Sequence, residues 1–150
     1  MRGKIFENTD RRKMLVGNVL ETEWHKNIFE LENDTRKVLV IAEGLLMYFS
    51  KEDNQKILKN IVSIATHGTL AVEMMRSSMM DEKKHDTVKE TNAKFGWGTT
   101  LGHEFEQLEP KIKLVSEHSF SEQMMKSTLL SRVIGLVSMK INNRIAIFEW

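Results

Sequence analysis

The stretch Val38-Leu-Val-Ile-Ala-Glu-Gly44 decides the fold of this chain. Its first five residues are apolar and mostly β-branched, a pattern typical of a strand buried on both faces in a parallel sheet. We expect this strand to end before Glu43 and Gly44, where the chain changes character. In a parallel sheet this carboxylate would lie at the carboxyl ends of the strands, where α/β proteins bind ligands.

A helix is expected after this stretch. Ser50 can cap its first turn, and apolar residues recur at helical spacing from Ile57 to Ala65. Gly68 is predicted to end the helix, because glycine accepts the left-handed conformation beyond a last turn. Thr69–Glu73 then reads as a second strand. The whole unit has about the length that a parallel strand-helix-strand crossover needs.

The flanking segments continue the alternation of strands and helices. On the amino-terminal side we expect a strand over Met14–Val19 and a short helix near Trp24. After the second strand, Asp81–Lys94 reads as a solvated helix because it is mostly charged. Leu101–Leu108 is predicted to form a short amphipathic helix that Pro110 stops.

Three further elements close the chain. They are a strand over Ile112–Val115, a helix over Ser121–Ser138 and a final strand over Arg144–Phe148. The resulting order predicts an α/β three-layer sandwich, with residues 1–150 forming a single domain.

Composition excludes several classes of function. Among 150 residues, 22 Lys and Arg stand against 21 Asp and Glu, giving a net charge of +1. This balance gives no electrostatic reason to expect nucleic acid or an anionic membrane as a partner. Cysteine is absent, so disulfides and thiolate metal sites are excluded, and the histidines show no metal-ligand spacing. Apolar runs are too short to cross a bilayer. We therefore expect a cytoplasmic protein without a metal site.

The segment Val38–Phe49 also resembles a known signature. An apolar strand, Glu-Gly, two apolar residues and Met-Tyr are similar to the strand-plus-loop pattern of the leucine carboxyl methyltransferase and polyketide-type O-methyltransferase family. Phe95-Gly-Trp97-Gly98 and Asn142-Asn143-Arg144-Ile145 resemble later parts of the same family. The resemblance spans nearly the whole chain.

This resemblance implies an incomplete class I methyltransferase fold, which is Rossmann-like. The family's sheet has the strand order 3-2-1-4-5-7-6, with the last strand antiparallel. By resemblance this chain carries strands 3 to 7 and lacks the first two, in a mostly parallel sheet. In the family's sheet the two missing strands lie between strands 3 and 4, so their absence leaves a gap there, and three outcomes are possible. Strand 3 pairs directly with strand 4, a second chain supplies the missing edge, or the product is poorly stable.

The resemblance further implies S-adenosylmethionine as cofactor. Glu43 would face the amino group of its methionine part, and Gly44 would let the loop pass close to the ligand because it has no Cβ. Asn18 aligns where the family often has an acid near the adenine. Val19 and Leu20 would supply apolar contact to the ring.

Tyr48 and Trp97 resemble family residues that line the binding site of the methyl acceptor. Glycines flank Trp97, which suggests a hinge. A general base would help if the acceptor were a hydroxyl, and His103 and His118 are candidates for it, whereas a carboxylate acceptor needs none. The resemblance itself identifies no catalytic residue.

The implied function is S-adenosylmethionine-dependent O-methyl transfer to a carboxyl or hydroxyl group of a small molecule. The Gly-rich turn that binds the cofactor in this family has no counterpart in the sequence, so weak or absent cofactor binding is expected for this chain alone. Its partners would be a second copy or a separate amino-terminal half.

Two alternatives remain. One is a non-catalytic partner-binding module, or one half of a split enzyme that pairs with a separate cofactor-binding chain. The other is a small-molecule-binding α/β domain in which Glu43 and Trp97 face one pocket.

Overall fold

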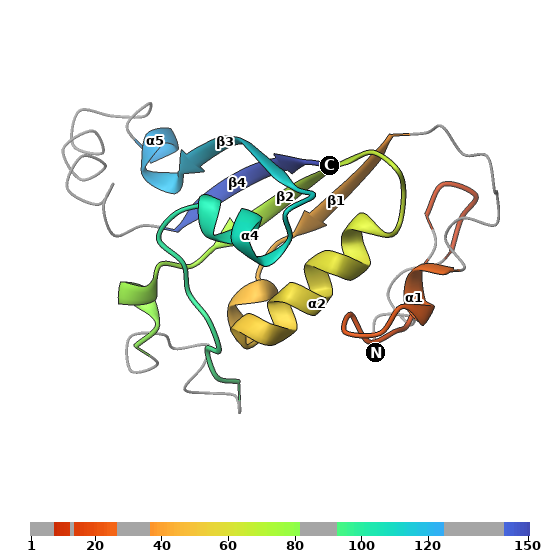
Figure 1. Cartoon of the computed structure of the whole chain (residues 1–150), viewed down its shortest axis with the longest axis horizontal. Coiled ribbons are helices and arrows are strands. Elements are labelled where there is room, and N and C mark those ends of the chain that lie inside the picture. Colours follow the sequence, from red (N-terminus) through yellow and green to blue (C-terminus); the bar gives the residue numbers. More distant parts are fainter. Residues whose placement is uncertain (1–7, 13, 27–36, 82–92, 125–142) are drawn as a thin grey trace.

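The computed structural model describes residues 8–12, 14–26, 37–81, 93–124 and 143–150. In this part of the chain, short helices and strands alternate (Figure 1). In chain order, the elements are α1 (Glu23–Lys26), β1 (Val38–Ala42), η2 (Leu46–Tyr48), α2 (Lys51–Val62), β2 (Gly68–Met74), η3 (Ser77–Met79), α4 (His103–Leu108), β3 (Lys113–Ser119), α5 (Phe120–Met124) and β4 (Arg144–Glu149).

The four strands form one mixed sheet in the order β1-β2-β4-β3. Strands β1 and β2 are parallel, and β4 runs antiparallel to both of its neighbours, β2 and β3. Three strands therefore share one direction, and the last strand in the chain opposes them. This confirms the expected small α/β domain with an antiparallel last strand.

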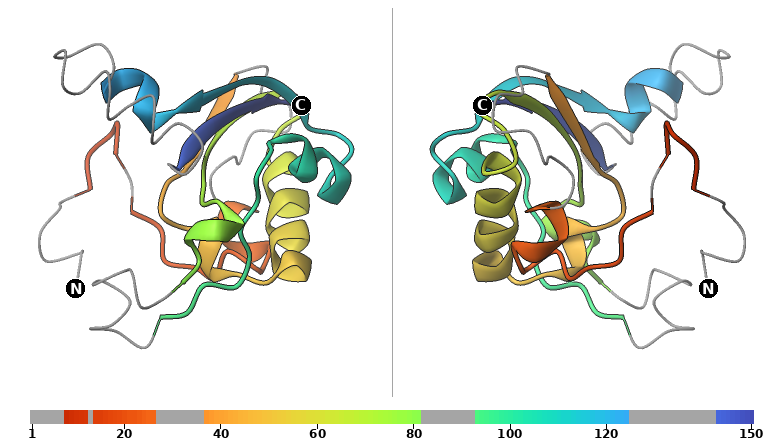
Figure 2. Two further views of the ribbon diagram at one scale, coloured as in Figure 1. Left: turned by 90° about the vertical axis from the view of Figure 1, so that its left-hand side faces the viewer. Right: turned by 90° about the vertical axis from the view of Figure 1, so that its right-hand side faces the viewer.

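The core lies between the sheet and two helices. Figure 2 shows α2 and α4 on the same side of the sheet. Leu70 and Val72 of β2 and Ile57 and Leu58 of α2 are fully buried there. Burying an apolar side chain of this size contributes about 1.5–3 kcal/mol. Helices α2 and α4 form one layer on this face, where the three-layer expectation also places a layer of helices on the opposite face.

Strand β4 contributes Phe148 to this core. Phe148 is fully buried, and its ring lies 5.5 Å from that of Phe105 on α4. Helix α4 is in turn tied to β3 through Glu106, whose carboxylate accepts hydrogen bonds from His103 Nδ1 (2.8 Å) and the Leu114 backbone N–H (2.9 Å). The hydrogen bond from His103, with that from Leu114, lowers the pKa of Glu106.

The start of α2 is as predicted, but its end is not. Ser50 Oγ accepts a hydrogen bond from the Asp53 backbone N–H (3.0 Å), so Ser50 caps the helix. The helix ends at Val62, and the Ser63 hydroxyl donates to the Asn60 carbonyl (2.7 Å).

Gly68 opens strand β2 instead of ending α2, so its predicted role as a helix stop is wrong. Its backbone exchanges two hydrogen bonds of 3.1 Å with Trp150. A Cβ at this position would lie 2.2 Å from the Trp150 ring. Glycine is therefore needed here for the close approach of the indole.

The predicted strand over Met14–Val19 is also wrong. The segment has no strand conformation, and Val16 is fully exposed. Asn18 instead forms a turn, because its side chain accepts from the Leu20 N–H (3.1 Å) and its carbonyl accepts from the Glu21 N–H (3.0 Å). Among the described residues β1 is consequently an edge strand, and direct pairing of the third and fourth family strands, one of the three outcomes considered, is not found there.

Two predicted helices fall largely outside the described residues. The described residues do not include most of Asp81–Lys94 or the greater part of Ser121–Ser138. The helix predicted over Ser121–Ser138 begins within the described part, as α5. The short helix predicted over Leu101–Leu108 is confirmed as α4. No helix in the described part has the length and apolarity to cross a membrane.

Candidate functional site

A cavity of about 160 Å³ lies where β1 and β2 end, on the sheet face away from α2 and α4. We call this face the open face. Side chains that share it, by strand register, are those of Leu39, Ile41, Thr69, Ala71, Glu73, Ile145, Ile147, Ser116 and His118. The cavity is lined by Ile41, Ala42, Glu43, Ala71, Val72, Glu73, Phe120 and Ile145. It thus combines apolar walls with two carboxylates.

Glu43 reaches this cavity because it is the first residue after β1, and it is exposed. Gly44 follows with a φ of +58°, the left-handed region that favours glycine. A Cβ on Gly44 would meet no atom within 4 Å. The glycine therefore turns the chain away from β1 and leaves the space beside the Glu43–Gly44 loop open.

Glu73 holds this loop in place. Its Oε2 accepts a hydrogen bond from the Gly44 N–H (3.0 Å), and its Oε1 accepts one from Asn143 Nδ2 (3.0 Å). One carboxylate at the end of β2 thereby joins the loop after β1 to the residue that precedes β4. Hydrogen bonds to an ionised acceptor are stronger than neutral ones, so this link restrains the shape of the cavity.

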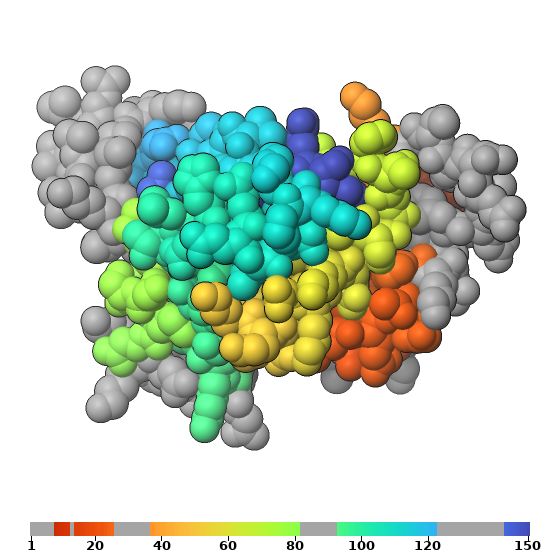
Figure 3. Space-filling view, in the orientation of Figure 1, coloured from red at the N-terminus to blue at the C-terminus, as the bar shows by residue number. Residues whose placement is uncertain are grey.

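The predicted adenine-side residues lie elsewhere. Asn60, in the last turn of α2, donates from Nδ2 to the Val19 carbonyl (3.2 Å) and to the Glu21 carbonyl (3.1 Å). Figure 3 shows the segment around Asn18–Leu20 in orange against the yellow end of α2. This end of α2 leads into the start of β2, whereas Glu43 lies at the opposite ends of the strands.

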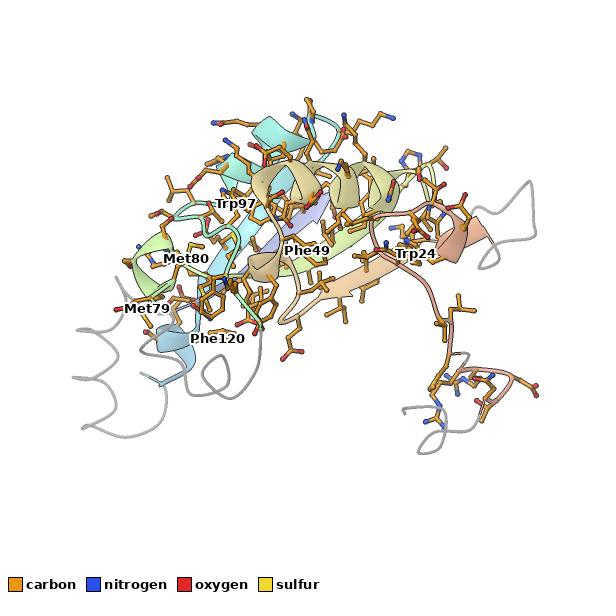
Figure 4. All side chains as sticks on the ribbon, turned by 90° about the horizontal axis from the view of Figure 1, so that it is seen from below. Trp24, Phe49, Met79, Met80, Trp97 and Phe120 are labelled. Carbon is orange, nitrogen blue, oxygen red and sulfur yellow. The ribbon has the colours of Figure 1, made fainter. Side chains whose placement is uncertain are left out.

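Figure 4 shows the same separation between the two ends of the molecule. Trp24 lies at one end, and Met79, Met80 and Phe120 lie at the other. The structure thus does not bring Asn18, Val19 and Leu20 together with Glu43 and Gly44. A contact of the former with adenine stays a prediction.

The two predicted acceptor-side aromatics have different surroundings. Tyr48 is 40% exposed, and its ring stacks on Phe95 with centroids 5.5 Å apart. Trp97 is half-buried and makes an edge contact with Phe105, with centroids 5.1 Å apart. Tyr48 can therefore reach a ligand directly, whereas Trp97 packs against the core.

The glycines around Trp97 permit a close crossing of two loops. The Gly96 N–H donates to the Met47 carbonyl (2.9 Å), and a Cβ there would lie 2.4 Å from the Phe49 carbonyl oxygen. Trp97 and Met47 line a second, small cavity, to which Glu73 also contributes. Glu43 lines the first cavity, and it is not among the residues that line the second. That Glu43 and Trp97 face one pocket, as the small-molecule-domain alternative requires, stays a prediction.

The two histidines considered as bases lie on different sides of the sheet. His118 of β3 is paired with Ile145, which lines the cavity on the open face, and its Nδ1 lies 3.4 Å from Glu122 Oε2. His103 belongs to α4, which covers the other face. Within the described ranges, no group of three or more His, Asp or Glu side chains could hold a metal ion.

The chain is distantly similar to a known protein. No protein-family model matches the chain. Over 120 residues the chain is 22% identical to the tetracenomycin polyketide synthesis O-methyltransferase TcmP of Streptomyces glaucescens. The match covers 79% of this chain but 43% of that relative, so the chain spans less than half of its length. This similarity suggests a distant kinship with O-methyltransferases.

Sequence reasoning missed three residues of this site: Glu73, Phe120 and Asn143. Glu73 ends the predicted strand Thr69–Glu73, so the argument that singled out Glu43 could also have found it. Phe120 and Asn143 gave no such signal. Their positions follow from the placement of β4 between β2 and β3, which a sequence pattern does not reveal.

Proposed function

We propose that this chain is part of an S-adenosylmethionine-dependent O-methyltransferase and that it contributes the Glu43–Gly44 side of the cofactor site. The observation that carries the proposal is the sheet order β1-β2-β4-β3 with an antiparallel β4. Strands 4, 5, 7 and 6 of the class I methyltransferase sheet have this order and these directions. The distant similarity to an O-methyltransferase supports the same conclusion.

The residues at the cavity suit one end of such a cofactor. The exposed carboxylate of Glu43 can accept hydrogen bonds from an ammonium group, and the open space beside Gly44 admits a ligand next to the backbone. The cavity of about 160 Å³ is smaller than the ~300 Å³ at which pockets for drug-sized ligands begin. The remainder of the cofactor would therefore contact another polypeptide segment, and this chain alone would bind it weakly.

The bound cofactor would supply a methyl group on a sulfonium, which an acceptor oxygen displaces from sulfur. This chain's residues would position the reactants for in-line displacement. A carboxylate acceptor needs no base. For a hydroxyl acceptor, His118 is the better placed of the two histidines, because its β4 neighbour Ile145 lines the cavity.

The experiment is a titration of the isotopically labelled chain with S-adenosylhomocysteine, in which NMR measures the chemical shift of each backbone amide. We expect weak binding with shifts concentrated at Glu43, Gly44 and Glu73. Glu43→Gln should weaken binding, and the matched control Glu52→Gln, an exposed glutamate of α2, should not. No shift at Gly44 at millimolar ligand, or identical binding by Glu43→Gln, would refute the proposal.

A second candidate function is a partner-binding module, as in a split enzyme. The observation in its favour is the exposure of two large apolar side chains on β1, Leu39 (63%) and Ile41 (68%). The unpaired backbone N–H and C=O groups of an edge strand are a template for pairing with another polypeptide, and exposed apolar side chains beside them favour such an association. Co-expression with a polypeptide corresponding to the unmatched portion of the relative should restore methyl transfer if that polypeptide completes the enzyme.

A further inference from the structure

The outer edge of β1 is the least protected edge of the sheet. No strand in the described part of the chain pairs with it. Residues Val38–Ala42 contain no charge and no proline, and their pairing with β2 is regular. Edges of this kind pair readily with other strands.

The other edge of the sheet, β3, differs on each of these points. Its register shifts between Leu114 and Ser116, an irregularity of the bulge type. Lys113 and Glu117 place charges in the strand. Bulges and charges are the usual devices that prevent edge-to-edge association. Protection is thus present at one edge of the sheet and missing at the other.

The residues around β1 are self-complementary about Val40. In an antiparallel pair of β1 strands with Val40 opposite Val40, Leu39 of one copy faces Ile41 of the other, and Lys37 faces Glu43. Residues 37, 39, 41 and 43 alternate onto one face of the strand, the open face. Lys37 and Glu43 are exposed, as are Leu39 and Ile41.

We propose that this chain forms a two-fold symmetric dimer in which the β1 strands of two copies pair antiparallel about Val40. The interface is isologous: each copy contributes one Lys37 and one Glu43, so two ion pairs flank two apolar cross-strand pairs. The two four-stranded sheets become one continuous eight-stranded sheet, with both α2 helices on the same face. We assign the edge to a second copy because this register places Lys37 of each copy opposite Glu43 of the other.

This inference does not rest on methyl transfer, and its tests need no cofactor. In the dimer, the ammonium group of Lys37 from the second copy forms an ion pair with the carboxylate of Glu43. Binding of a ligand ammonium and self-pairing therefore compete for one side chain. A failure to bind S-adenosylhomocysteine would leave the dimer untouched, so the two proposals can fail separately.

The first test is a charge exchange, read by sedimentation equilibrium at low salt. Lys37→Glu and Glu43→Lys each convert two attractive pairs into two repulsive ones, and we expect each to raise the dimer dissociation constant by about tenfold or more. The double variant Lys37→Glu/Glu43→Lys restores both attractions and should return the constant to near the wild-type value. Both positions are exposed, and circular dichroism would verify that each variant folds.

Three outcomes would overturn the proposal. The wild-type chain is monomeric at every concentration, which would leave the edge to a different polypeptide. The single variants dimerise as well as the wild type. The double variant remains as weak as the single ones.

The second test uses the absence of cysteine from this chain. In the proposed register the two Val40 Cα atoms lie about 4.5–5.5 Å apart, within the range that a disulfide spans. Val40→Cys should therefore form a disulfide-linked dimer under mild oxidation. Leu39→Cys is the matched control: its sulfur is more exposed, but its own symmetry mate is diagonal, about 7–8 Å away. Faster cross-linking of Leu39→Cys than of Val40→Cys would contradict this register.

Discussion

Replacing Glu73 by glutamine tests whether one carboxylate joins the loop after β1 to the residue before β4. Glutamine has nearly the same shape but offers one acceptor oxygen and one donor nitrogen. It can keep the hydrogen bond from the Gly44 N–H or that from Asn143 Nδ2, and it then points a donor at the other donor. Hydrogen bonds to charged groups contribute about 1.5–3 kcal/mol each. Because the bond from Gly44 is exposed, the lower end applies.

We therefore expect Glu73→Gln to lower the free energy of unfolding by about 1.5 kcal/mol. For a chain of this size that corresponds to a fall in Tm of about 3–6 °C. Urea denaturation, with the slope held common to both proteins, gives the same quantity independently. Glu43→Gln, measured at a protein concentration at which the chain is monomeric, is the control, since it removes an equal charge from an exposed neighbouring position and should change stability by less than about 0.5 kcal/mol.

The double variant Glu73→Gln/Asn143→Asp makes the test specific. It exchanges donor and acceptor, so the amide introduced at position 73 can donate to the new carboxylate while its oxygen keeps the bond from Gly44. We expect the double variant to recover at least half of the loss. If Glu73→Gln is no less stable than Glu43→Gln, or if the two substitutions are simply additive, the link through Glu73 does not contribute as described.

Three further predictions concern the framework around the site. Gly68→Ala should lower stability by about 1–3 kcal/mol, because its Cβ would overlap the Trp150 ring; thermal unfolding would reveal it, and an unchanged Tm would contradict the packing. Ser50→Ala should cost about 1 kcal/mol through loss of the hydrogen bond that caps α2, whereas Ser50→Asp should retain it; equal stability of Ser50→Ala and wild type would refute the cap. The pKa of Glu106 is lowered by its hydrogen-bond donors, so its stabilising contribution is present above the ordinary value of 4.5 and is lost as the pH falls through the lowered value of the folded state. The stability difference between wild type and Glu106→Gln should therefore be largest near neutral pH and vanish in acid, and a difference that grows in acid would show the opposite sign.

The central strand-helix-strand unit was predictable because its signals are local. The apolar run Val38–Ala42 and the cap at Ser50 lie within the elements that they define, and both are found. The end of α2 was not predictable, since the reason for Gly68 is an indole ring from the other end of the chain. The segment Met14–Val19 has the composition of a strand, but in the described structure it has no neighbouring strand to pair with.

The residues of the candidate site likewise fall into those that local sequence predicts and those that only the assembled sheet reveals. Glu43 was found from its position after a buried strand, which the sequence states directly. The hydrogen bonds of Glu73 depend on the adjacency of β1 and β2 and on the residue that leads into β4. That adjacency is a property of the assembled sheet, and residues far apart in sequence meet there without any shared pattern.

Gly44 carries one more consequence. Its surroundings are empty, yet its backbone has a sign of φ that ordinary L-residues avoid. Size and handedness can thus be varied separately at this position. A D-alanine introduced by semisynthesis would have the natural chirality for φ of +58° and would stiffen the unfolded chain, which stabilises by about 0.4–1 kcal/mol, whereas L-alanine, with the same number of atoms, would be strained. The difference in unfolding free energy between the D-alanine and L-alanine proteins would measure the backbone preference for positive φ at position 44, without a contribution from steric crowding by neighbouring residues.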